Sequence, residues 1–419
     1  PHGKYELHYR DAHVTQESSA ALNNLKVIDL SVGYAGSYCT KILRDLGATV
    51  IKVESPETGD VTRQYGPFLN DEPNIETSAP FLYLNAGKKS VTLDVYDPKA
   101  VEIIKGLVST SDIIVESFHP GTMKSLGLSY EGLSELNPKI IMASLTHYGQ
   151  EGPYKEYLGS DITSYALSGY MYLTGDEDRE PLKAGGRQSE YQCGLSGALS
   201  IVAALIGRLF SNRGQYIDVA ATESLTSTFD GVGYFRTYER SGIEPLRAGT
   251  RLIAREPSAA YPSRLLPCKD GWVHVHYSPS NPEGLAFLTG SERLAEDEVL
   301  GEMMGHADEI DELLTTWLSN HTREEIQTLA QEVRVPFTMV QSIDETLNDP
   351  QNSYRNFFVD IDHSHAGTLK YPTSPFRLRT TEWMTESPPL LGQHNQEIYM
   401  DTLQLTEKEY KNLSDNRII

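Results

Sequence analysis

Residues 25–54 read LKVIDLSVGYAGSYCTKILRDLGATVIKVE, and this stretch decides the fold class. It opens with a short apolar run, Leu25 to Leu30, which is typical of a buried strand and leads into a turn of small residues, Gly33 to Gly36. Apolar residues at helical spacing follow as far as Leu46, and Thr49 to Val53 repeats the strand pattern. Strand, turn, helix and strand in this order predict one unit of a parallel sheet.

The same alternation continues further along the chain. Strands are predicted at Val91 to Val95, Asp112 to Val115, Ile140 to Leu145 and Tyr216 to Val219. Strands that alternate with helices imply an α/β fold, with a doubly wound parallel sheet that helices cover on both faces. Ligands of such sheets bind beyond the carboxyl ends of the strands, so the loops that follow the strands are the expected functional positions.

Residues 189–209 are predicted to form one long helix. Apolar side chains recur at spacings of three and four, at Leu195, Leu199, Val202, Ile206 and Leu209. Small residues, including Gly194 and Gly197, gather near its start. This pattern predicts a helix that is buried and closely packed.

The character of the sequence changes after residue 240. Loops rich in Arg and Pro are followed by a predicted strand, Trp272 to Tyr277, and by charged helices at Asp308 to Leu318 and Arg323 to Val333. The predicted organisation is an N-terminal arm (1–24), a large domain (25–240), a smaller inserted α+β domain (241–336) and a C-terminal segment (337–419) that returns to the large domain.

Composition narrows the class of protein. The chain has 419 residues, of which 39% are hydrophobic, and a formal charge of −22 that repels a polyphosphate backbone, so no nucleic-acid partner is expected. No apolar stretch of spanning length and no signal-like start is present in this sequence, so no membrane partner is expected. Cys39, Cys193 and Cys268 lie far apart, which argues against a disulfide framework and favours a cytoplasmic location.

Six short motifs in order along the chain carry a resemblance. They are Leu46 to Glu54 (LGATVIKVE), Gly59 to Arg63 (GDVTR), Lys88 to Asp94 (KKSVTLD), Val115 to Gly121 (VESFHPG), Gly214 to Val219 (GQYIDV) and Leu391 to His394 (LGQH). Together they resemble the family III CoA-transferases, whose members include formyl-CoA and carnitine CoA-transferases. The resemblance implies coenzyme A as substrate and carrier, a large domain built from both ends of the chain, and two chains interlocked as a dimer.

The resemblance also implies a catalytic position. In the family an aspartate opens the long helix and attacks the acyl thioester, and it lies four residues before a glycine. Counting back from Gly194 leads to Glu190. Glutamate keeps the carboxylate but moves its oxygens by about 1 Å, which is enough to remove much of the benefit of positioning. The alternative is that Glu190 supports the helix N-terminus with its negative charge.

Family positions for CoA fall on the turn after the first strand and on the ends of later strands. The matching residues are Tyr34, Ala35, Leu93, Tyr96, Ser117, Phe118, Thr146 and Tyr148. Relatives carry Arg or Lys where Ser55, Ser125 and Thr146 stand, so several phosphate partners are missing together. The candidates that compensate for them are Arg63, Lys88, Lys89 and Lys124.

These departures predict a subunit whose partner carries the nucleophilic aspartate, as in heteromeric transferases that activate benzylsuccinate with succinyl-CoA. The predicted reaction moves CoA from a donor such as succinyl-CoA to another carboxylic acid, for which an aryl-substituted succinate is one candidate. The predicted assembly is an interlocked heterodimer with a paralogue, or a homodimer. Arg247, Arg251 and Arg255 are candidates to hold a second carboxylate of the acid.

Three alternatives stay open at this point. The first is a self-sufficient homodimeric transferase that uses Glu190, and the second is a purely structural partner chain. The third is an acyl-CoA racemase of the same fold, whose relatives have Gly-His-Asp where this chain has Gly159-Ser160-Asp161, and Asp161 is expected to cap a helix instead. The pairs His274/His276 and His363/His365 each offer two ligands with no third nearby, so no metal is expected.

Overall fold

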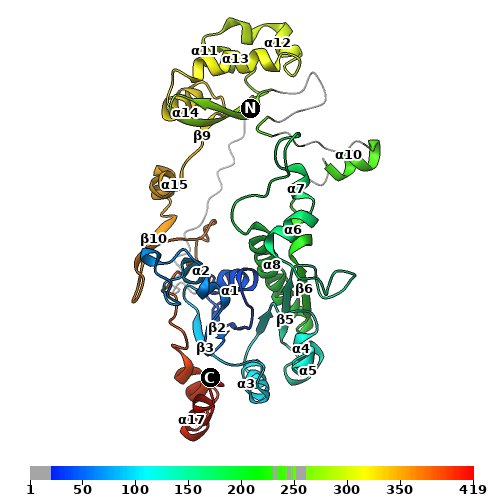
Figure 1. The fold of residues 1–419 in the computed structure, drawn as a ribbon, viewed down its shortest axis with the longest axis vertical. Coiled ribbons are helices and arrows are strands. Elements are labelled where there is room, and N and C mark those ends of the chain that lie inside the picture. The colour runs from blue at the N-terminus through cyan, green and yellow to red at the C-terminus, as the bar shows by residue number, and fades with distance from the viewer. Residues whose placement is uncertain (1–19, 230–233, 243–246, 248, 252–260) are drawn as a thin grey trace, which may run out of the picture. The chain divides into compact units, whose positions relative to one another are not determined.

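The computed structural model describes residues 20–229, 234–242, 247, 249–251 and 261–419 (Figure 1). Contacts divide the chain into two compact units. The first unit comprises residues 1–159, 189–224 and 357–419, and the second comprises 160–188 and 225–356. The domain limits given above stay a prediction.

The first unit is built on a parallel sheet of six strands. They are β1 (Lys26–Asp29), β2 (Thr49–Glu54), β3 (Lys89–Thr92), β4 (Ile113–Glu116), β5 (Ile141–Thr146) and β6 (Tyr216–Ala220), in the order β3-β2-β1-β4-β5-β6. Every pairing is parallel, which confirms the predicted fold class. The strand order reverses between β1 and β4, and such a switch point opens a crevice at the carboxyl edge of the sheet.

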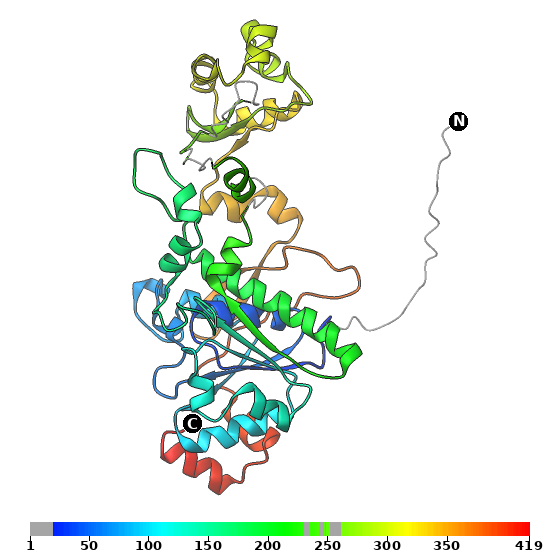
Figure 2. The same ribbon diagram turned by 90° about the vertical axis from the view of Figure 1, so that its right-hand side faces the viewer.

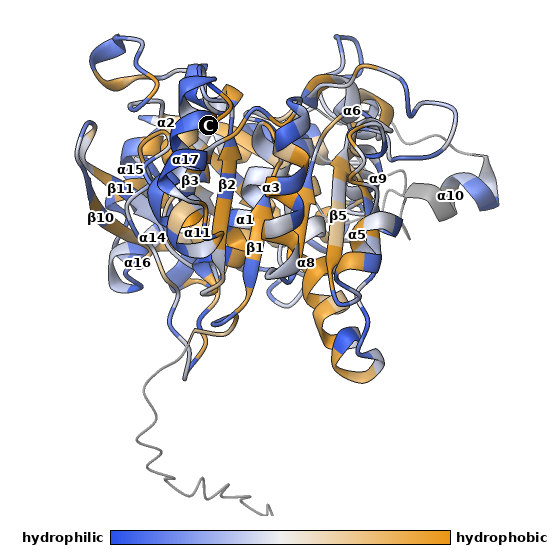
Figure 3. Cartoon of the chain, turned by 90° about the horizontal axis from the view of Figure 1, so that it is seen from below, coloured by the Kyte–Doolittle hydropathy of each residue, from blue (hydrophilic) through white to orange (hydrophobic). Residues whose placement is uncertain are grey.

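Helices cover both faces of this sheet. They are α1 (Tyr34–Asp45), α2 (Ala79–Leu84), α3 (Pro98–Ser109), α4 (Thr122–Ser125), α5 (Tyr130–Leu136), α8 (Gln188–Ser211), α9 (Ala221–Thr226) and α17 (Glu407–Asp415). Successive strand residues point to opposite faces, so Ile28 packs in one core with α3, α5 and α17 while Val27 packs in another with α1 and α8. β4 and β5 are mainly apolar, as expected of strands buried on both sides, while β1, β2 and β3 also carry polar and charged residues (Figure 3).

Helix α8 is the predicted long helix, but its packing face differs from the prediction. Its buried residues are a stripe of small side chains and Ile201, whereas the predicted core residues Leu199 and Leu209 are exposed, Leu209 by 80%. A Cβ at Gly194 would lie 2.5 Å from the carbonyl oxygen of Ala35, so only glycine permits this approach. The helix runs along the sheet as one long rod (Figure 2). It packs through its small residues and leaves its larger apolar side chains exposed.

By length and composition α8 is the one helix among the described residues that is able to cross a membrane. Its small-residue face packs in the core of the first unit against Leu43 of α1 and Leu145 of β5. This contact is that of a core helix in a globular sheet protein.

The second unit contains a small antiparallel sheet. Its strands are β7 (Ser263–Cys268), β8 (Gly271–His276) and β9 (Thr338–Met339), in the order β7-β8-β9. Its helices are α6 (Asp161–Leu167), α7 (Tyr170–Leu173), α10 (Tyr234–Ser241), α11 (Gly284–Thr289), α12 (Asp297–Gly301), α13 (Ala307–Leu318), α14 (Arg323–Glu332), α15 (Ile343–Asn348) and α16 (Pro350–Tyr354). Val273 and Val275 of β8 pack with Ile310 and Leu314 of α13. The predicted strand and both charged helices are confirmed to within one residue.

Residues 357–419, most of the predicted C-terminal segment, belong to the first unit, while 337–356 belong to the second. The part in the first unit forms the hairpin of β10 (Phe358–His363) and β11 (Gly367–Pro372) and then follows β3 toward α17. The amide N–H of Gly392 donates to Ser90 Oγ (2.9 Å), and the Tyr399 hydroxyl donates to the Thr92 carbonyl (2.6 Å). Residues about three hundred positions apart in the sequence thus build one edge of the sheet.

Candidate active site

A cavity of about 330 Å³ lies in the first unit at the carboxyl edge of the sheet. Its walls are the residues that directly follow β1, β2, β3 and β4, namely Leu30 to Val32, Ser55, Leu93 to Tyr96 and Phe118, together with residues 58–61. This is the position at which open α/β sheets bind ligands. It is called the carboxyl-edge cavity below.

The structure brings three of the predicted CoA-binding residues together here. Leu93 is buried in the floor, Phe118 is half-buried, and Tyr96 is 65% exposed, as a side chain at the rim would be. Ser55, which stands where relatives carry a cation, also lines the cavity. The aromatic and aliphatic surfaces of this wall suit a planar ring.

Carboxylates line this cavity, and two of them are paired with buried cations behind the wall, Glu54 with Arg63 (2.7 Å) and Asp60 with Lys52 (3.1 Å). Its lining includes the carboxylates of Glu54, Asp60 and Asp94, and none of the described residues that line it is Lys, Arg or His. A phosphate group is disfavoured next to carboxylates unless cations are added. The missing phosphate partners inferred from the sequence are therefore missing from the cavity as well.

Arg63 lies in the protein interior. Its Nε donates to Glu54 Oε2 (2.7 Å), its Nη1 donates to Glu76 (2.7 Å), and its Nη2 donates to the Pro389 carbonyl (3.2 Å). The guanidinium also stacks over the Phe81 ring, 3.5 Å from its centroid. The side chain is fully buried, so a phosphate contact would require breaking these bonds, and the structure argues for a structural role.

The candidate cations Lys89 and Lys124 lie outside the carboxyl-edge cavity. Lys89 forms an ion pair with Glu397 and lines a second cavity at the opposite edge of the sheet. Lys124 is exposed on the short helix α4. Neither lines the carboxyl-edge cavity.

The remaining predicted residues hold loops together. Ser117 Oγ accepts a hydrogen bond from the Val32 amide (2.8 Å) and donates to the Val32 carbonyl (3.1 Å), which ties the turn after β1 to the end of β4. Thr146 Oγ1 accepts from the Gly149 amide (2.9 Å). The Tyr148 ring contacts those of Tyr154 and Tyr157.

A buried ionic network lies beneath the cavity, and the sequence reasoning missed it. Lys52 Nζ donates to the Ser31 carbonyl (2.5 Å) and pairs with Asp60 Oδ2 (3.1 Å), which also accepts from the Gly33 amide (3.2 Å). Ser31 and Asp60 line the cavity from two different loops. Lys52 therefore joins the two loops, and the signal for it was a charged residue inside an apolar strand.

Lys88, another candidate partner for phosphate, is buried in the same ionic network and does not line the carboxyl-edge cavity. Its Nζ donates to Asp29 Oδ2 (3.0 Å), to the Ser37 carbonyl (2.9 Å) and to Thr40 Oγ1 (2.7 Å). Burial opposes the charge of Asp29, but Lys52 and Lys88 outweigh it and lower its pKa to about 2. Burial lowers the pKa of Lys88 to about 8 although Asp29 favours its charged form.

Glu116 at the end of β4 fixes the loop that carries Phe118. Its Oε2 accepts from the Phe118 amide (2.7 Å). Burial raises the pKa of this carboxyl to about 7, while hydrogen bonds from Ser144 and from the Phe118 amide act in the opposite direction.

Glu190 lies half-buried in the first turn of α8. The next residue, Tyr191, packs edge-on against Tyr34 (6.0 Å between centroids) and Tyr38 (4.8 Å). With the close contact between Gly194 and Ala35, this places the predicted residues Tyr34 and Ala35 against the first two turns of α8. Burial and the negative charge of Glu190 raise the pKa of the Cys193 thiol, which therefore stays protonated.

Comparison with known proteins decides the family. The model of CoA-transferase family III matches residues 22–395. The chain belongs to this family.

Similar proteins cover nearly all of the chain. A succinate–glutarate CoA-transferase of Agrobacterium fabrum is 30% identical over 92% of this chain and 97% of its own length. A succinyl-CoA–D-citramalate CoA-transferase of Chloroflexus aurantiacus is 31% identical over 97% of this chain and its full length. The BbsE subunit of succinyl-CoA:(R)-benzylsuccinate CoA-transferase from Thauera aromatica is 29% identical over 90% of this chain and 93% of its own.

A solved structure shows the same fold. A CAIB/BAIF family protein from Brucella suis superimposes with a TM-score of 0.80 at 30% identity, covering 92% of this chain and all of that protein. As a family III CoA-transferase, the chain is an acyl-CoA:carboxylate CoA-transferase, and its ligand is the thioester of coenzyme A.

In the second unit the structure corrects one assignment. Asp161 is the first residue of α6 and pairs with Lys183 (2.8 Å), while the N-cap is Ser160, one residue earlier than predicted. The cause is that Ser160 and Thr163 form a capping box, which fixes the helix start.

The arginines expected to hold a second carboxylate are engaged within the second unit. Arg251 pairs with Asp308 (2.8 Å) and Asp311 (2.9 Å). Arg247 donates to backbone carbonyls, including that of Asp176 (3.0 Å). Arg255 lies outside the described residues, so the structure gives the dicarboxylate hypothesis no support from this group.

Among the described residues no group of three or more His, Cys, Asp or Glu side chains is arranged to hold a metal ion. The rings of His274 and His276 stack on one face of β8, 6.3 Å apart. Those of His363 and His365 are 6.2 Å apart and tilted.

Proposed function

We propose that this chain is one subunit of a CoA-transferase that moves CoA from an acyl-CoA donor such as succinyl-CoA to another carboxylic acid, with the nucleophilic aspartate on a partner chain. Two relatives support the donor, since their names specify succinyl-CoA. Two relatives support the subunit role, since one is the BbsE subunit and another is the β subunit of a succinyl-CoA–L-malate CoA-transferase, 30% identical over 95% of this chain.

The observation that carries the proposal is that no cation is found among the described residues that line the carboxyl-edge cavity. Its apolar wall of Leu93 and Phe118 suits adenine, but its described lining has three carboxylates and no cation to meet the phosphates of CoA. A chain that acts alone needs those cations in its own site. In a pair of unlike chains, one complete site is sufficient.

Glu190 supports the same reading through its chemistry. A CoA-transferase carboxylate must attack the acyl carbon, which forms a mixed anhydride and releases the CoA thiolate. The thiolate then attacks the protein carbonyl, which releases the donor acid and gives an enzyme thioester. The incoming carboxylate attacks this thioester, forms a second mixed anhydride and releases the thiolate, which attacks the new acyl carbon and frees the protein carboxylate. Glutamate places its oxygens about 1 Å from where aspartate would, and such a displacement costs on the order of a hundredfold in rate. At a helix N-terminus its negative charge is also stabilised, which makes it less reactive.

Helix α8 supplies a surface for the partner chain. Its outward face carries exposed apolar side chains at Leu195, Leu199, Ile206, Leu209 and Phe210. Chains that remain single rarely expose a continuous apolar stripe of this kind. We expect Leu199→Glu with Leu209→Glu to abolish pairing in sedimentation experiments, while Leu158→Glu, at an exposed leucine away from α8, leaves it intact.

Trapping the acyl-enzyme tests the proposal. The purified chain is incubated with a panel of acyl-CoA thioesters, quenched with hydroxylamine or borohydride, and mapped by mass spectrometry. The expected result is no adduct on Glu190 and no turnover by the chain alone. An adduct on Glu190 together with turnover would show a self-sufficient transferase and overturn the proposal.

Two controls distinguish the proposal from the remaining alternatives. Glu190→Asp restores the residue type of the family, so adduct formation in this variant alone shows that the rest of the site is competent. Exchange of the α-proton for deuterium without an adduct would indicate the racemase, and failure of the isolated chain to bind CoA would indicate a structural partner.

A further inference from the structure

The three carboxylates that line the carboxyl-edge cavity differ in their hydrogen bonding. Both oxygens of Glu54 are occupied within the protein. Its Oε2 accepts from Arg63 Nε (2.7 Å) and from the Asp60 amide (2.9 Å), and its Oε1 accepts from Arg63 Nη2 (3.0 Å) and from Ser90 Oγ (2.6 Å). A carboxylate accepts about four hydrogen bonds, so the buried Glu54 has no acceptor left for a ligand.

Asp60 is occupied in the same way. Its Oδ1 accepts from the amide (2.8 Å) and from the hydroxyl (2.6 Å) of Thr62. Its Oδ2 accepts from the Gly33 amide (3.2 Å) and pairs with Lys52 (3.1 Å). The residue is buried, and all of these contacts are made within the protein. Asp60 therefore holds the loops of the cavity together and has no acceptor left for a ligand.

Among the described residues of the lining, Asp94 is the carboxylate with an oxygen that no protein donor contacts. The residue is exposed, and its Oδ1 accepts from the Tyr96 amide (3.1 Å), which leaves Oδ2 available. Its backbone is fixed, because its amide donates to the Ile418 carbonyl (2.7 Å) and its carbonyl accepts from the Asp97 amide (3.0 Å). The cavity thus offers one held acceptor to a ligand.

The side chains next to Asp94 suit a flat apolar group. Leu93 and Tyr96 flank it in the sequence and line the cavity together with Phe118. Nucleic-acid bases stack on aromatic side chains of this kind, whereas carboxylates without a cation disfavour a phosphate. A ligand that fits has a planar ring, an N–H donor and no negative charge. The adenine base is the part of CoA with these properties, since its exocyclic amine is a donor.

We propose that Asp94 accepts a hydrogen bond from the exocyclic amine of adenine and makes the cavity selective for adenine over a 6-oxopurine. A 6-oxopurine has a carbonyl oxygen in place of the amine, so two acceptors would face each other and neither would gain a hydrogen bond. The carboxylate that disfavours a phosphate thus favours the base. The inference deepens the function proposed above, because it rests on CoA as the ligand.

Titration of the full chain with adenosine and with inosine, followed by ligand-observed NMR, tests the proposal without any phosphate or acyl group. We expect adenosine to bind about tenfold more tightly than inosine, the effect of one hydrogen bond to a charged group. In Asp94→Asn the carboxamide presents either its oxygen or its NH₂ group to the base. The two affinities should therefore lie within about threefold of each other in this variant.

Asp97→Asn is the matched control. Asp97 caps α3 by accepting from the Lys99 amide (2.8 Å) and does not line the cavity. Asparagine caps a helix as well as aspartate does, so this variant should keep the preference of the parent chain for adenosine. The preference is a ratio measured within one variant, and a loss of folded protein lowers both affinities without changing it.

Displacement locates the bound nucleoside. Saturating 3′-dephospho-CoA should displace adenosine, because both place adenine in the same cavity. Equal affinities of the parent chain for the two nucleosides would overturn the proposal, as would an unchanged preference in Asp94→Asn or the absence of displaceable adenosine binding at millimolar concentration. These results leave the subunit role intact, whereas an adduct on Glu190 with turnover would overturn that role and leave the adenine contact intact.

Discussion

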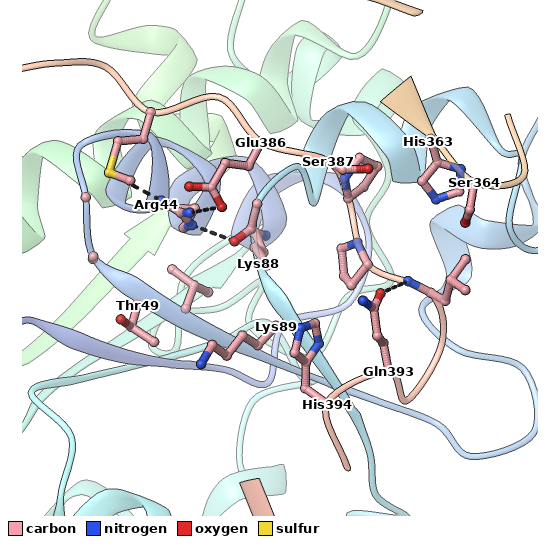
Figure 4. Close-up of a pocket in the computed structure, with 18 of the residues that line it drawn as sticks. Arg44, Thr49, Lys88, Lys89, His363, Ser364, Glu386, Ser387, Gln393 and His394 are labelled. Carbon is pink, nitrogen blue, oxygen red and sulfur yellow. Dashed lines mark hydrogen bonds and ion pairs between the residues drawn. The ribbon is translucent and has the colours of Figure 1, made fainter. Parts of the chain in front are cut away.

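Two cavities lie at opposite edges of one sheet and differ in the charged side chains that line them. The carboxyl-edge cavity is lined by Glu54, Asp60 and Asp94 with no described cation. The second cavity, at the amino edge of the sheet, is lined by three cations and one carboxylate, namely Arg44, Lys88, Lys89 and Glu386 (Figure 4). The comparison shows that cations line the cavity at the amino edge, whereas the CoA phosphates are expected at the carboxyl edge. The fold of a CoA-transferase is retained, while the described lining of the carboxyl-edge cavity holds no cation.

The ionic network beneath the carboxyl-edge cavity gives the largest expected effect. Lys52→Met and Lys88→Met each remove one buried ammonium from Asp29, and each should lower the free energy of unfolding by about 3–5 kcal/mol in urea titrations. Only Lys52 bonds to the two loops of the cavity, so only Lys52→Met should also weaken CoA binding in the fraction that is folded. Equal loss of CoA binding in both variants would contradict this assignment.

Glu116 gives a pH dependence to the same edge. Its pKa rises from 4.5 to about 7 on folding, so the folded state holds an extra proton between these values. Its contribution is fully present below pH 4.5, is lost as pH rises through 7, and amounts to about 3 kcal/mol. Glu116→Gln should remove this dependence from urea titrations at pH 4.5 and 8, while the exposed Glu135→Gln should retain it.

A cation introduced at the carboxyl edge sharpens the comparison. Ser55→Arg adds a guanidinium to the cavity wall at a position where relatives carry one. We expect CoA to bind about tenfold more tightly, the effect of one or two charge-assisted hydrogen bonds, in equilibrium titrations. Ser109→Arg, at an exposed residue of α3 that does not line the cavity, is the control and should leave the affinity unchanged. An unchanged affinity in Ser55→Arg would mean that the phosphates lie elsewhere.

The sequence predicted the sheet well because its strands are buried on both faces and each contains a short run rich in apolar and β-branched residues. It predicted α8 as a helix but assigned the wrong face to the core, because periodicity reveals two stripes without showing which one packs. The glycines decided this, since a side chain at Gly194 would collide with the Ala35 carbonyl. Larger apolar residues such as Leu199 were consequently left outside.

The site could be predicted only in part. Leu93, Tyr96 and Phe118 meet in one cavity because strand ends meet at one edge of a parallel sheet. Arg63 was expected to be available for phosphate, but its partners include Pro389, which is more than three hundred residues away. The cavity at the amino edge of the sheet is also lined by residues far apart in the sequence, such as Arg44 and Glu386. No local sequence pattern predicts such pairs.

The central claim is that the carboxyl-edge cavity receives the apolar part of CoA without cations for its phosphates. The most direct test compares the affinity of the isolated chain for CoA and for 3′-dephospho-CoA by calorimetry at low ionic strength. The account predicts equal affinities within about twofold, because no described cation meets the 3′-phosphate. Binding of CoA that is tighter by tenfold or more would contradict it.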